Sequence, residues 1–311
     1  MPPLISIITP CLNRVDYIDE AVRSVLDQQY SPIEHIVVDG GSTDGTLEKL
    51  RRYNHVTVMT GKDTGLYDAI NKGIRSSKGE LIGLLNSDDT YKKDVFSDWA
   101  QQFERHPEAD VVSGNAVIFK QIASQPKTIL RYLDYGFGGL SVYDVLTDAR
   151  YPNTRLYRKR LFDQIGLFDP SYRIAGDGEF LLRAALAQVK NVRFPRFVYE
   201  YRQHPGSLTI NTSDAQWRPA LEEELYIAQT YLVKDDLPMS AKVLLQGWRV
   251  KMFWRGIKKA LQNNHSSLTW HYVMNAIRSI LWWPMAGTLF LGSKIARFPN
   301  IKYRIGQAKL S

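Results

Sequence analysis

Short apolar runs alternate with helical patterns through the first hundred residues, and this alternation constrains the fold more than any other feature of the chain. Strand-like runs cover residues 4–9, 34–39, 56–60 and 81–85. Helical spacing of apolar residues appears between them, through residues 21–26, 46–53 and 66–76, with Asn13 and Asp16 offering N-cap chemistry for the first helix. Strands that alternate with helices predict an α/β fold with a Rossmann-like, mostly parallel sheet and flanking helices.

The residues that directly follow each apolar run are candidates for ligand binding, because ligands of such sheets lie beyond the carboxyl ends of the strands. They are residues 9–13, 39–42, 61–63 and 86–89. The sequence has no Gly-x-x-x-x-Gly-Lys-Ser/Thr segment, and no Gly-x-Gly-x-x-Gly segment follows a strand, which argues against a P-loop and an NAD-type site. We therefore expect side chains, rather than a glycine loop, to bind the ligand.

Two of these strand ends are acidic. Asn86-Ser87-Asp88-Asp89 follows the fourth run, where oxygen ligands suit Mg²⁺ or Mn²⁺ together with substrate phosphates. A polar turn that caps a helix at Val95 is an equally open interpretation. Asp39 ends the second run and precedes Gly-Gly-Ser-Thr-Asp-Gly, so its carboxylate could accept hydrogen bonds from a nucleobase or a ribose, or could form a simple Asx turn.

Four blocks together resemble glycosyltransferase family 2, the inverting enzymes with a GT-A fold. They are Ile-Ile-Thr-Pro-Cys-Leu-Asn at 7–13, Val-Val-Asp-Gly-Gly-Ser-Thr-Asp-Gly at 37–45, Asp-Thr-Gly-Leu-Tyr-Asp-Ala-Ile-Asn-Lys-Gly-Ile at 63–74 and Gly-Glu-Leu-Ile-Gly-Leu-Leu-Asn-Ser-Asp-Asp at 79–89. One such block would be weak evidence, whereas four in order at fitting spacing are specific. The resemblance covers roughly the first third of the chain.

The resemblance implies roles for particular residues. Those expected to hold the nucleotide are Thr9, Pro10, Asn13, Asp39, Gly41, Asp68, Asn86 and Ser87, with Asp39 facing the base. Asp88 matches the metal-binding acid of the Asp-x-Asp motif, and His204 resembles a late segment that can reach the diphosphate or the metal. A lone histidine beside proline is also a common loop residue. The implied cofactor is Mn²⁺ or Mg²⁺, and Asp89 and Arg202 are assigned to the acceptor or diphosphate side.

The chain departs from the family pattern at two donor-side positions. Asn86 stands where the first Asp of the motif is usual, which weakens the charge at the metal site, although one carboxylate plus diphosphate oxygens can still bind the ion. Ala69-Ile70-Asn71 stands where many relatives carry Ala-Arg-Asn, so a cation near the diphosphate is expected to be missing.

Residues 166–183 resemble the acceptor-side block of the family. Asp177 falls on its catalytic Asp, with Gly176 where Glu is common. Inversion requires a base that takes the acceptor proton as the oxygen attacks the anomeric carbon, and a carboxylate that opens a helix can do this. The alternative is that Asp177 only caps the helix that carries Phe180, Leu181 and Ala184.

The charge of the chain is divided between two regions. From Ala241 to Ser311 there are twelve Lys or Arg and no acid, so 40 minus 12, or 28, basic residues face 32 acids in the rest. The same tail holds five of the seven tryptophans, with Arg278 and Pro284 interrupting its apolar stretch at 273–291. Cations beside tryptophans predict peripheral attachment to an anionic membrane surface rather than a spanning helix. A helical subdomain that packs on the catalytic domain is the alternative, and no nucleic-acid motif supports a nucleic-acid partner.

The single cysteine, Cys11, excludes an internal disulfide and is expected to be a buried packing residue. The N-terminal residues lack the pattern of a signal peptide. We therefore expect a cytoplasmic protein on the inner face of the membrane.

The sequence thus predicts a GT-A catalytic domain at residues 1–215, with a nucleotide-binding half at 1–118 and an acceptor half at 119–215. A helical, basic, aromatic-rich extension follows at 216–311. We expect an inverting transferase that moves a sugar from a nucleotide-sugar donor, UDP-linked by preference, to a hydroxyl of a glycan or lipid-linked acceptor. Residues 135–139 are expected to form a loop over the site. A sugar-nucleotide nucleotidyltransferase and a non-catalytic membrane-bound scaffold are the alternatives.

Overall fold

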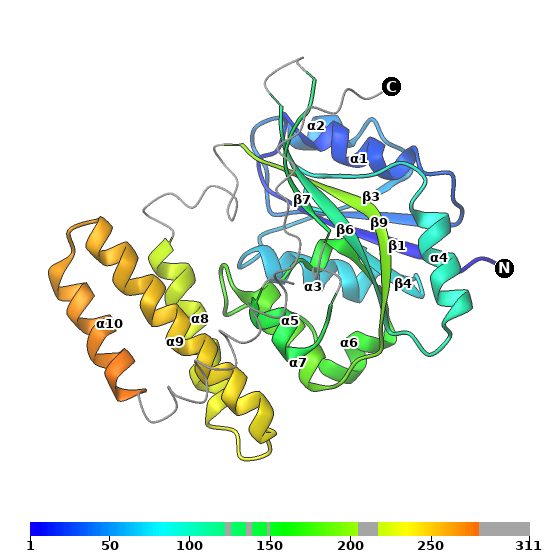
Figure 1. Ribbon diagram of the computed structural model, residues 1–311. Coiled ribbons are helices and arrows are strands. Elements are labelled where there is room, and N and C mark those ends of the chain that lie inside the picture. Colours follow the sequence, from blue (N-terminus) through cyan, green and yellow to red (C-terminus); the bar gives the residue numbers. More distant parts are fainter. Residues whose placement is uncertain (122–125, 135–138, 148–149, 205–216, 280–311) are drawn as a thin grey trace. The chain divides into compact units, whose positions relative to one another are not determined.

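One mixed sheet organises the larger part of the molecule. The computed structural model describes residues 1–121, 126–134, 139–147, 150–204 and 217–279, which fall into two compact units, Met1–Glu223 and Glu224–Ser311. The first unit contains a sheet of order β3-β2-β1-β4-β8-β6-β9-β5, with β7 paired to β6 (Figure 1). Its strands are β1 (Ile5–Cys11), β2 (Ile33–Asp39), β3 (Val56–Thr60), β4 (Leu81–Leu84), β5 (Thr90–Tyr91), β6 (Val111–Lys120), β7 (Thr128–Leu133), β8 (Arg155–Arg158) and β9 (Asn191–Arg202).

The four strands predicted from the N-terminal sequence form the parallel part of the sheet. β1 pairs in parallel with β2 on one side and with β4 on the other, and β3 extends the order from β2. The register places Cys11 opposite Asp39, so the ends of β1 and β2 lie level at the carboxyl edge. Beyond β4 the direction changes, because β8 pairs antiparallel with both β4 and β6. The α/β class is confirmed: the first four strands form an all-parallel block, and β6 and β9 also pair in parallel in the mixed remainder of the sheet.

Helices cover both faces of this sheet, as Figure 1 shows. On one face are α1 (Ile18–Leu26), α2 (Thr46–Leu50) and α4 (Phe96–Arg105), and on the other are α3 (Leu66–Ser76), α6 (Arg160–Ile165) and α7 (Gly176–Leu186), with α5 (Val142–Thr147) against α7 and a 3₁₀ turn at Pro152–Thr154. Gly73 lets α3 approach the sheet, since a Cβ there would overlap the side chain of Ile8. The central strands β1, β4, β6 and β8 are largely buried, and burial of their apolar side chains supplies the main driving force for folding.

The predicted start of the first helix is wrong. The N-cap position of α1 is Tyr17, which makes no side-chain cap hydrogen bond, and Asn13 and Asp16 do not cap it. Instead the carbonyl of Arg14 accepts the N–H groups of Tyr17 and Ile18 in a turn that precedes the helix. Asn13 has a positive φ of 52° and bonds to the loop after β2, which local helix signals cannot indicate.

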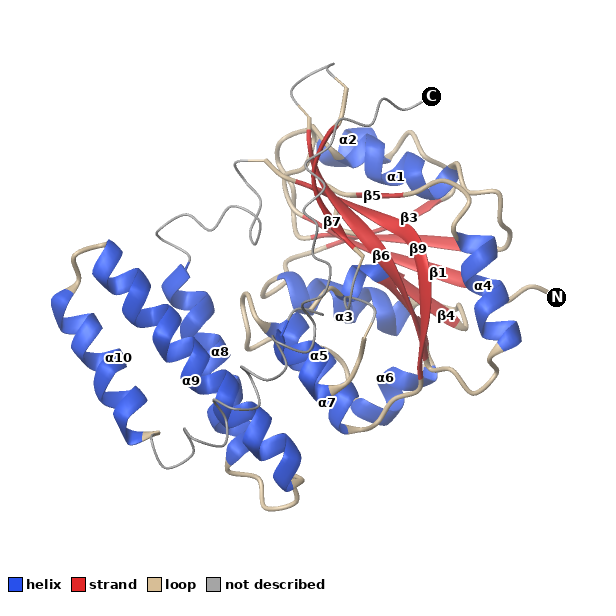
Figure 2. Cartoon of the chain, viewed as in Figure 1, coloured by secondary structure: helices blue, strands red, loops and turns tan. Residues whose placement is uncertain are grey.

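The second unit is helical, which confirms the predicted extension. α8 (Trp217–Leu232) begins in the first unit, and α9 (Met239–Gln262) and α10 (Ser266–Arg278) follow (Figure 2). Within this unit Arg249 on α9 donates to Gln229 on α8 at 3.1 Å, and Tyr272 and Ala276 of α10 are buried. None of the helices among the described residues is both long and apolar enough to span a bilayer. Residues 280–291 of the stretch that raised this question, and residues 135–138 of the predicted loop, lie outside the described residues.

Candidate active site at the carboxyl edge of the sheet

One oxygen of the Asp39 carboxylate is hydrogen-bonded within the protein, and the other has no partner. Its Oδ1 accepts the backbone N–H groups of Gly41 at 2.9 Å and Ser42 at 2.8 Å. Gly41 has a φ of +100°, a conformation that glycine adopts without strain. The second oxygen, Oδ2, is buried and has no hydrogen-bond partner. The Asx-turn interpretation therefore explains only one oxygen, and the other is available to an N–H or O–H of a ligand.

Asn13 joins the loops that follow β1 and β2. Its backbone N–H donates to Ser42 Oγ at 2.7 Å, and its Oδ1 accepts the N–H of Thr43 at 2.9 Å. Asp44 accepts the N–H of Val15 at 3.0 Å, which adds a third link between the same loops. Asn13 thus shapes the edge of the site around Asp39, whatever further contact it makes with a ligand.

The side chain of Thr9 faces the interior of the fold. Its Oγ1 lies 2.9 Å from Nε2 of His35, and both residues are buried. Burial lowers the pKa of His35 to about 3, so its ring is neutral at physiological pH. The hydroxyl of Thr9 is therefore engaged inside the fold, and Pro10 is likewise buried in strand β1. At these two positions only the backbone is left for contact with a nucleotide. The sequence analysis did not identify His35.

Asp88 and His204 meet beyond the end of β4, although 116 residues separate them in the sequence. Asp88 Oδ2 lies 2.9 Å from His204 Nε2 and 3.6 Å from Arg14 Nε. The ring of Tyr17 lies 4.6 Å from that of His204 and supports it. The structure thus brings the two predicted metal ligands together. It also places a cation beside them at Arg14, a residue that the sequence analysis passed over.

Asp88 and His204 can be compared with the ligands that a divalent ion requires. Among the residues that the structure describes, no group of three or more His, Cys, Asp or Glu side chains converges in a metal-binding arrangement. A carboxylate and an imidazole nevertheless fit an ion that takes few protein ligands and completes its shell with phosphate oxygens and water. The pair therefore suits a metal that arrives with a diphosphate.

Asn86 is explained by its neighbour Asp89. The amide Nδ2 of Asn86 donates to Asp89 Oδ2 at 2.9 Å, and the hydroxyl of Tyr199 donates to the same oxygen at 2.9 Å. Burial and the nearby charge of Asp88 raise the pKa of Asp89 well above its usual range. An Asp at position 86 would set a second carboxylate against Asp89, with a desolvated like-charge repulsion. Asn86, the residue that departs from the family motif, thus forms a structural hydrogen bond inside the acidic turn.

This turn is also supported by three buried residues, Arg202, Ser87 and Cys11. Arg202 is buried, donates from its backbone N–H to Asp89 Oδ1 at 2.8 Å and donates from Nε to the carbonyl of Asp88 at 3.0 Å. Ser87 is also buried, next to the thiol of Cys11. Burial, with the charge of Asp39 adding to it, raises the pKa of Cys11 to about 12, so the thiol stays protonated as a packing residue.

Asp177 is the second residue of α7 and is not its cap. The N-cap position is Ala175, and Asp177 Oδ1 accepts the N–H of the adjacent Gly178 at 2.7 Å. The backbone N–H of Asp177 donates to the hydroxyl of Tyr67 at 3.1 Å. Gly176 is explained by the same tyrosine, because a Cβ at this position would lie 2.6 Å from the ring of Tyr67. The interpretation of Asp177 as an N-cap is therefore wrong.

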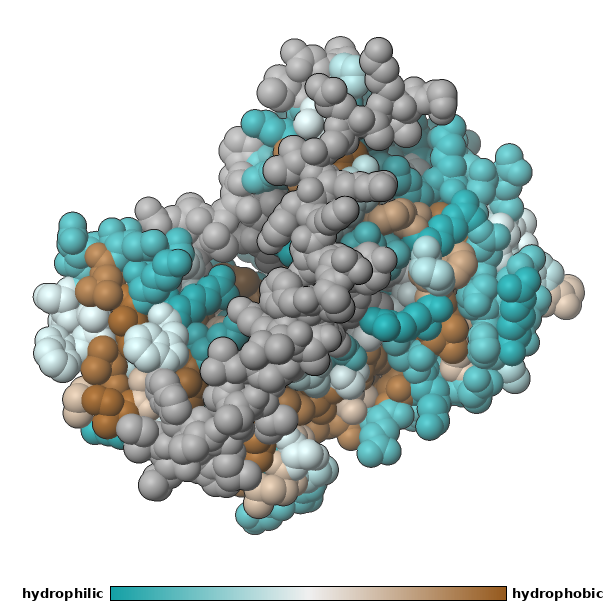
Figure 3. All heavy atoms as spheres, viewed as in Figure 1, coloured by the Kyte–Doolittle hydropathy of each residue, from teal (hydrophilic) through white to brown (hydrophobic). Residues whose placement is uncertain are grey.

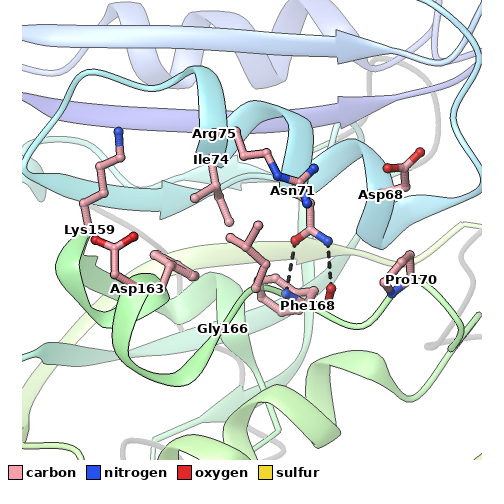
Figure 4. A pocket seen from close by; sticks show the side chains of 11 residues that line it. Asp68, Asn71, Ile74, Arg75, Lys159, Asp163, Gly166, Phe168 and Pro170 are labelled. Atoms are coloured by element: carbon pink, nitrogen blue, oxygen red, sulfur yellow. Dashed lines mark hydrogen bonds between the residues drawn. The ribbon is translucent and has the colours of Figure 1, made fainter.

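Asp68 lines a cavity of about 690 Å³ whose lining includes none of the other predicted nucleotide or metal residues. Its Oδ2 accepts the N–H of Thr64 and pairs with Lys72, both at 3.0 Å. Figure 4 shows Asp68 at one end of this cavity and Asn71 between α3 and the segment around Phe168. Asn71 bonds both the N–H and the carbonyl of Phe168. The amide thus ties helix α3 to the segment that leads to α7.

Comparison with known proteins adds to this geometry. The model of Glycosyl transferase family 2 matches residues 6–166. The chain is 29% identical over 239 residues to the uncharacterized glycosyltransferase EpsJ of Bacillus subtilis (strain 168), covering 72% of this chain and 67% of that protein.

Two solved structures share the fold. S. aureus TarS 1–349 in complex with UDP-GlcNAc is similar with a TM-score of 0.63 and 18% identity, over 93% of this chain and 92% of that one. The chain covers 43% of a longer TarS structure. The mannosyltransferase PcManGT of Pyrobaculum calidifontis, in complex with GDP-Man and Mn²⁺, matches with a TM-score of 0.57 and 17% identity, over 94% and 88% of the two chains. At these identities the likeness concerns the fold alone.

Proposed function

The chain belongs to glycosyl transferase family 2, and from this premise we propose that it is an inverting enzyme that uses a nucleoside diphosphate sugar, with UDP as the nucleotide. The acceptor is a hydroxyl of a glycan or of a lipid-linked sugar. The observation that carries the proposal is the meeting of Asp88 and His204 at 2.9 Å beyond β4. These two side chains could bind a divalent ion, and they lie at the edge of the sheet where α/β folds bind their ligands.

Asp39 is the proposed contact to the base. Its Oδ2 is buried and unpartnered, and an ionised carboxylate is only an acceptor. The edge of a uracil offers an N–H donor of matching kind. Both TarS with UDP-GlcNAc and PcManGT with GDP-Man share the fold, which supports a nucleoside diphosphate sugar as the donor, and the choice of UDP rests on the match between Asp39 and the uracil edge.

Asp88 and His204 are the residues that would hold Mn²⁺ or Mg²⁺. When bound, the ion would offset the negative charge that develops on the departing diphosphate. Arg14, with its Nε 3.6 Å from Asp88, adds a fixed positive charge at the same end of the site. This cation can replace the arginine that the resemblance led us to expect at position 70.

Asp177 is the proposed general base. It takes the proton of the acceptor hydroxyl while that oxygen forms a bond to the anomeric carbon and the bond to the diphosphate breaks on the opposite face, which inverts the configuration. The support is the position of its carboxylate in the first turn of α7, and the engagement of its backbone with Tyr67.

A panel of nucleotide sugars, assayed for hydrolysis and transfer with Mn²⁺, tests the proposal. We expect turnover of one UDP-sugar that is lost with EDTA and in Asp88→Ala, and retained in Asp235→Ala, an exposed acid on the second unit. A nucleotidyltransferase would instead release pyrophosphate from a nucleoside triphosphate and a sugar phosphate. A scaffold would turn over none of these compounds, and activity unaffected by EDTA would contradict the metal role.

We further propose that the second unit attaches the enzyme to an anionic membrane. Trp270, Met274 and Ile277 on α10 are 66%, 47% and 51% exposed and lie on the face opposite the buried Tyr272 and Ala276. In the space-filling view apolar atoms lie along this helix (Figure 3). The region beyond Ala241 has twelve cations and no acid, which favours anionic headgroups beside the exposed apolar side chains.

Co-sedimentation with phosphatidylglycerol vesicles tests the attachment. The triple alanine variant at Trp270, Met274 and Ile277 should bind more weakly than the full chain, while Leu26→Ala, which removes an exposed leucine from α1, should bind normally. Binding of the triple variant equal to that of the full chain would contradict the role of this face. Binding to RNA that competes with the vesicles would favour a nucleic-acid partner instead.

A further inference from the structure

Three consecutive backbone N–H groups converge on one carboxylate just before α7. Glu223 Oε1 accepts the N–H of Arg173 at 2.9 Å, and Glu223 Oε2 accepts those of Ile174 at 2.9 Å and Ala175 at 2.8 Å. Glu223 lies on α8 and is the last residue of the first unit, so all four residues belong to one compact body. The acceptor comes from 48 to 50 residues further along the chain.

These N–H groups belong to the residues that lead into α7, at its N-cap position and just before it. A helix start leaves several N–H groups unsatisfied, and a side-chain oxygen at the N-cap normally accepts one of them. The N-cap of α7 is Ala175, which has no such oxygen and makes no side-chain cap hydrogen bond. Glu223 therefore holds, from another helix, the segment that enters α7, and its negative charge suits the positive end of the helix dipole.

A continuous chain of hydrogen bonds runs from Glu223 to Asp177. The carbonyl of Ile174 accepts the hydroxyl of Tyr67 at 2.8 Å, and that hydroxyl accepts the backbone N–H of Asp177 at 3.1 Å. Tyr67 is 3% exposed, and its ring is stacked on Phe168 with centroids 5.8 Å apart. Tyr67 is thus fixed by packing, and the segment held by Glu223 is fixed against it.

We propose that Glu223 is a positioning residue for the catalytic base: it holds residues 173–175 so that α7 starts where Asp177 faces the acceptor. The inference rests on the proposed function, in which Asp177 is the base. It has a consequence for the extension, since a chain cut at the predicted boundary of residue 215 would lack this carboxylate. The part of α8 that belongs to the first unit thus contributes to the proposed acceptor side.

Loss of the carboxylate should affect turnover more than donor binding. A displacement of about 1 Å in a reacting group can reduce the rate about 10²-fold. Glu223→Ala should therefore lower kcat by about 10- to 100-fold and leave the KM for the donor within about twofold, because Asp39 and Asp88 lie outside the held segment. Glu223→Gln keeps one acceptor oxygen for three donors and should show a smaller loss. Glu222→Gln is the matched control, since the Glu222 side chain lies next to Glu223 in the sequence and pairs with the exposed Arg218.

The full-length chain with each substitution, alone and combined with Asp177→Asn, provides the test. If Glu223 acts through Asp177, its substitution should reduce kcat in the wild-type background and have no further effect in the Asp177→Asn background. Equal losses in both backgrounds, or an unchanged kcat in Glu223→Gln and Glu223→Ala, would overturn the positioning role. If Glu223→Ala does not fold, the kcat of Glu223→Gln in the same two backgrounds decides the test. Should Asp177→Asn itself keep full turnover, the proposed function fails, and that result is distinct from a failure of Glu223 alone.

Discussion

The proposed donor side and the proposed acceptor side of the candidate site hold their carboxylates in different ways. Asp39 is oriented by the N–H groups of Gly41 and Ser42, two and three residues further along the same motif. Asp177 sits in a segment whose position depends on Tyr67, 110 residues away, and on Glu223. The donor side is therefore a local device, whereas the acceptor side is assembled from three distant parts of the chain.

This difference predicts how the two sides respond to change. A locally held carboxylate should tolerate alterations elsewhere in the fold, and its substitution should weaken ligand binding directly. A carboxylate held from a distance should control the rate, with donor binding largely unaffected. Substitutions at Asp177, Asp39 and His35 test this division, with the largest effect expected at Asp177.

The largest effect is expected at the acceptor side. Asp177→Asn removes the proton acceptor and keeps the size of the side chain, so turnover should fall by about 10²- to 10⁴-fold, the usual contribution of a positioned base. Donor affinity, measured by titration with UDP, should change little. The anomeric configuration of the product, determined by NMR, should be inverted.

Two outcomes would break this side of the comparison. A large loss of UDP affinity in Asp177→Asn would show that the two sides are not independent. A product with retained configuration would refute the inverting mechanism whatever the variant does. A carboxylate in the first turn of a helix adds only about 0.3–1 kcal/mol through the helix dipole, so a helix-stabilising role alone would leave turnover nearly unchanged.

A smaller effect is expected at Asp39. Asp39→Asn can keep Oδ1 for the turn but presents an N–H group in place of the buried Oδ2. A hydrogen bond to a charged acceptor contributes about 1.5–3 kcal/mol, so affinity for UDP should fall by roughly 10- to 150-fold while kcat at saturating donor changes less. Asp16→Asn, an exposed acid near the same loops, is the control. Unchanged affinity for UDP in Asp39→Asn would show that the unpartnered oxygen does not face the base.

The sequence predicted the donor side in detail because its signals are local. Residues 56–60 and 66–76 form β3 and α3 with the expected bounds. The acid at the end of β2 and its glycine turn are adjacent in sequence and in space. Periodicity and turn residues were sufficient here, since each element of the parallel sheet has its own apolar run.

What the sequence could not predict are the partners that come from far along the chain. Glu223 gives no motif, because a glutamate on a helix face usually points to solvent. His35 sits in an apolar strand, and its bond to Thr9 depends on the register of β1 and β2. The hydrogen bond from Asn86 to Asp89 is local in the sequence. Asn is favoured at position 86 because Asp89 is buried by Tyr199 and Arg202, which lie more than 100 residues away. Such contacts are set by tertiary packing, which periodicity does not encode.

The smallest effect concerns the support of the donor side by the core. Burial lowers the pKa of His35 to about 3 in the folded protein, whereas an unperturbed histidine titrates near 6.5. Between these values the unfolded chain binds a proton that the folded chain does not, so the free energy of unfolding decreases as the pH falls below about 6.5. At pH 5.5, one unit lower, the loss is about 1.4 kcal/mol.

His35→Gln removes the titration and can keep a hydrogen bond to Thr9. Urea unfolding at pH 7 and pH 5.5 should therefore show a smaller pH dependence in this variant, by about 1.3 kcal/mol, than in the parent. His106→Gln, at a histidine whose side chain is 43% exposed, should behave like the parent. An unchanged pH dependence in His35→Gln would mean that the buried pair does not carry the acid sensitivity. If stability becomes less pH-dependent while UDP affinity at pH 7 is retained, then the local turn around Asp39, rather than the core beneath it, is sufficient to form the donor side.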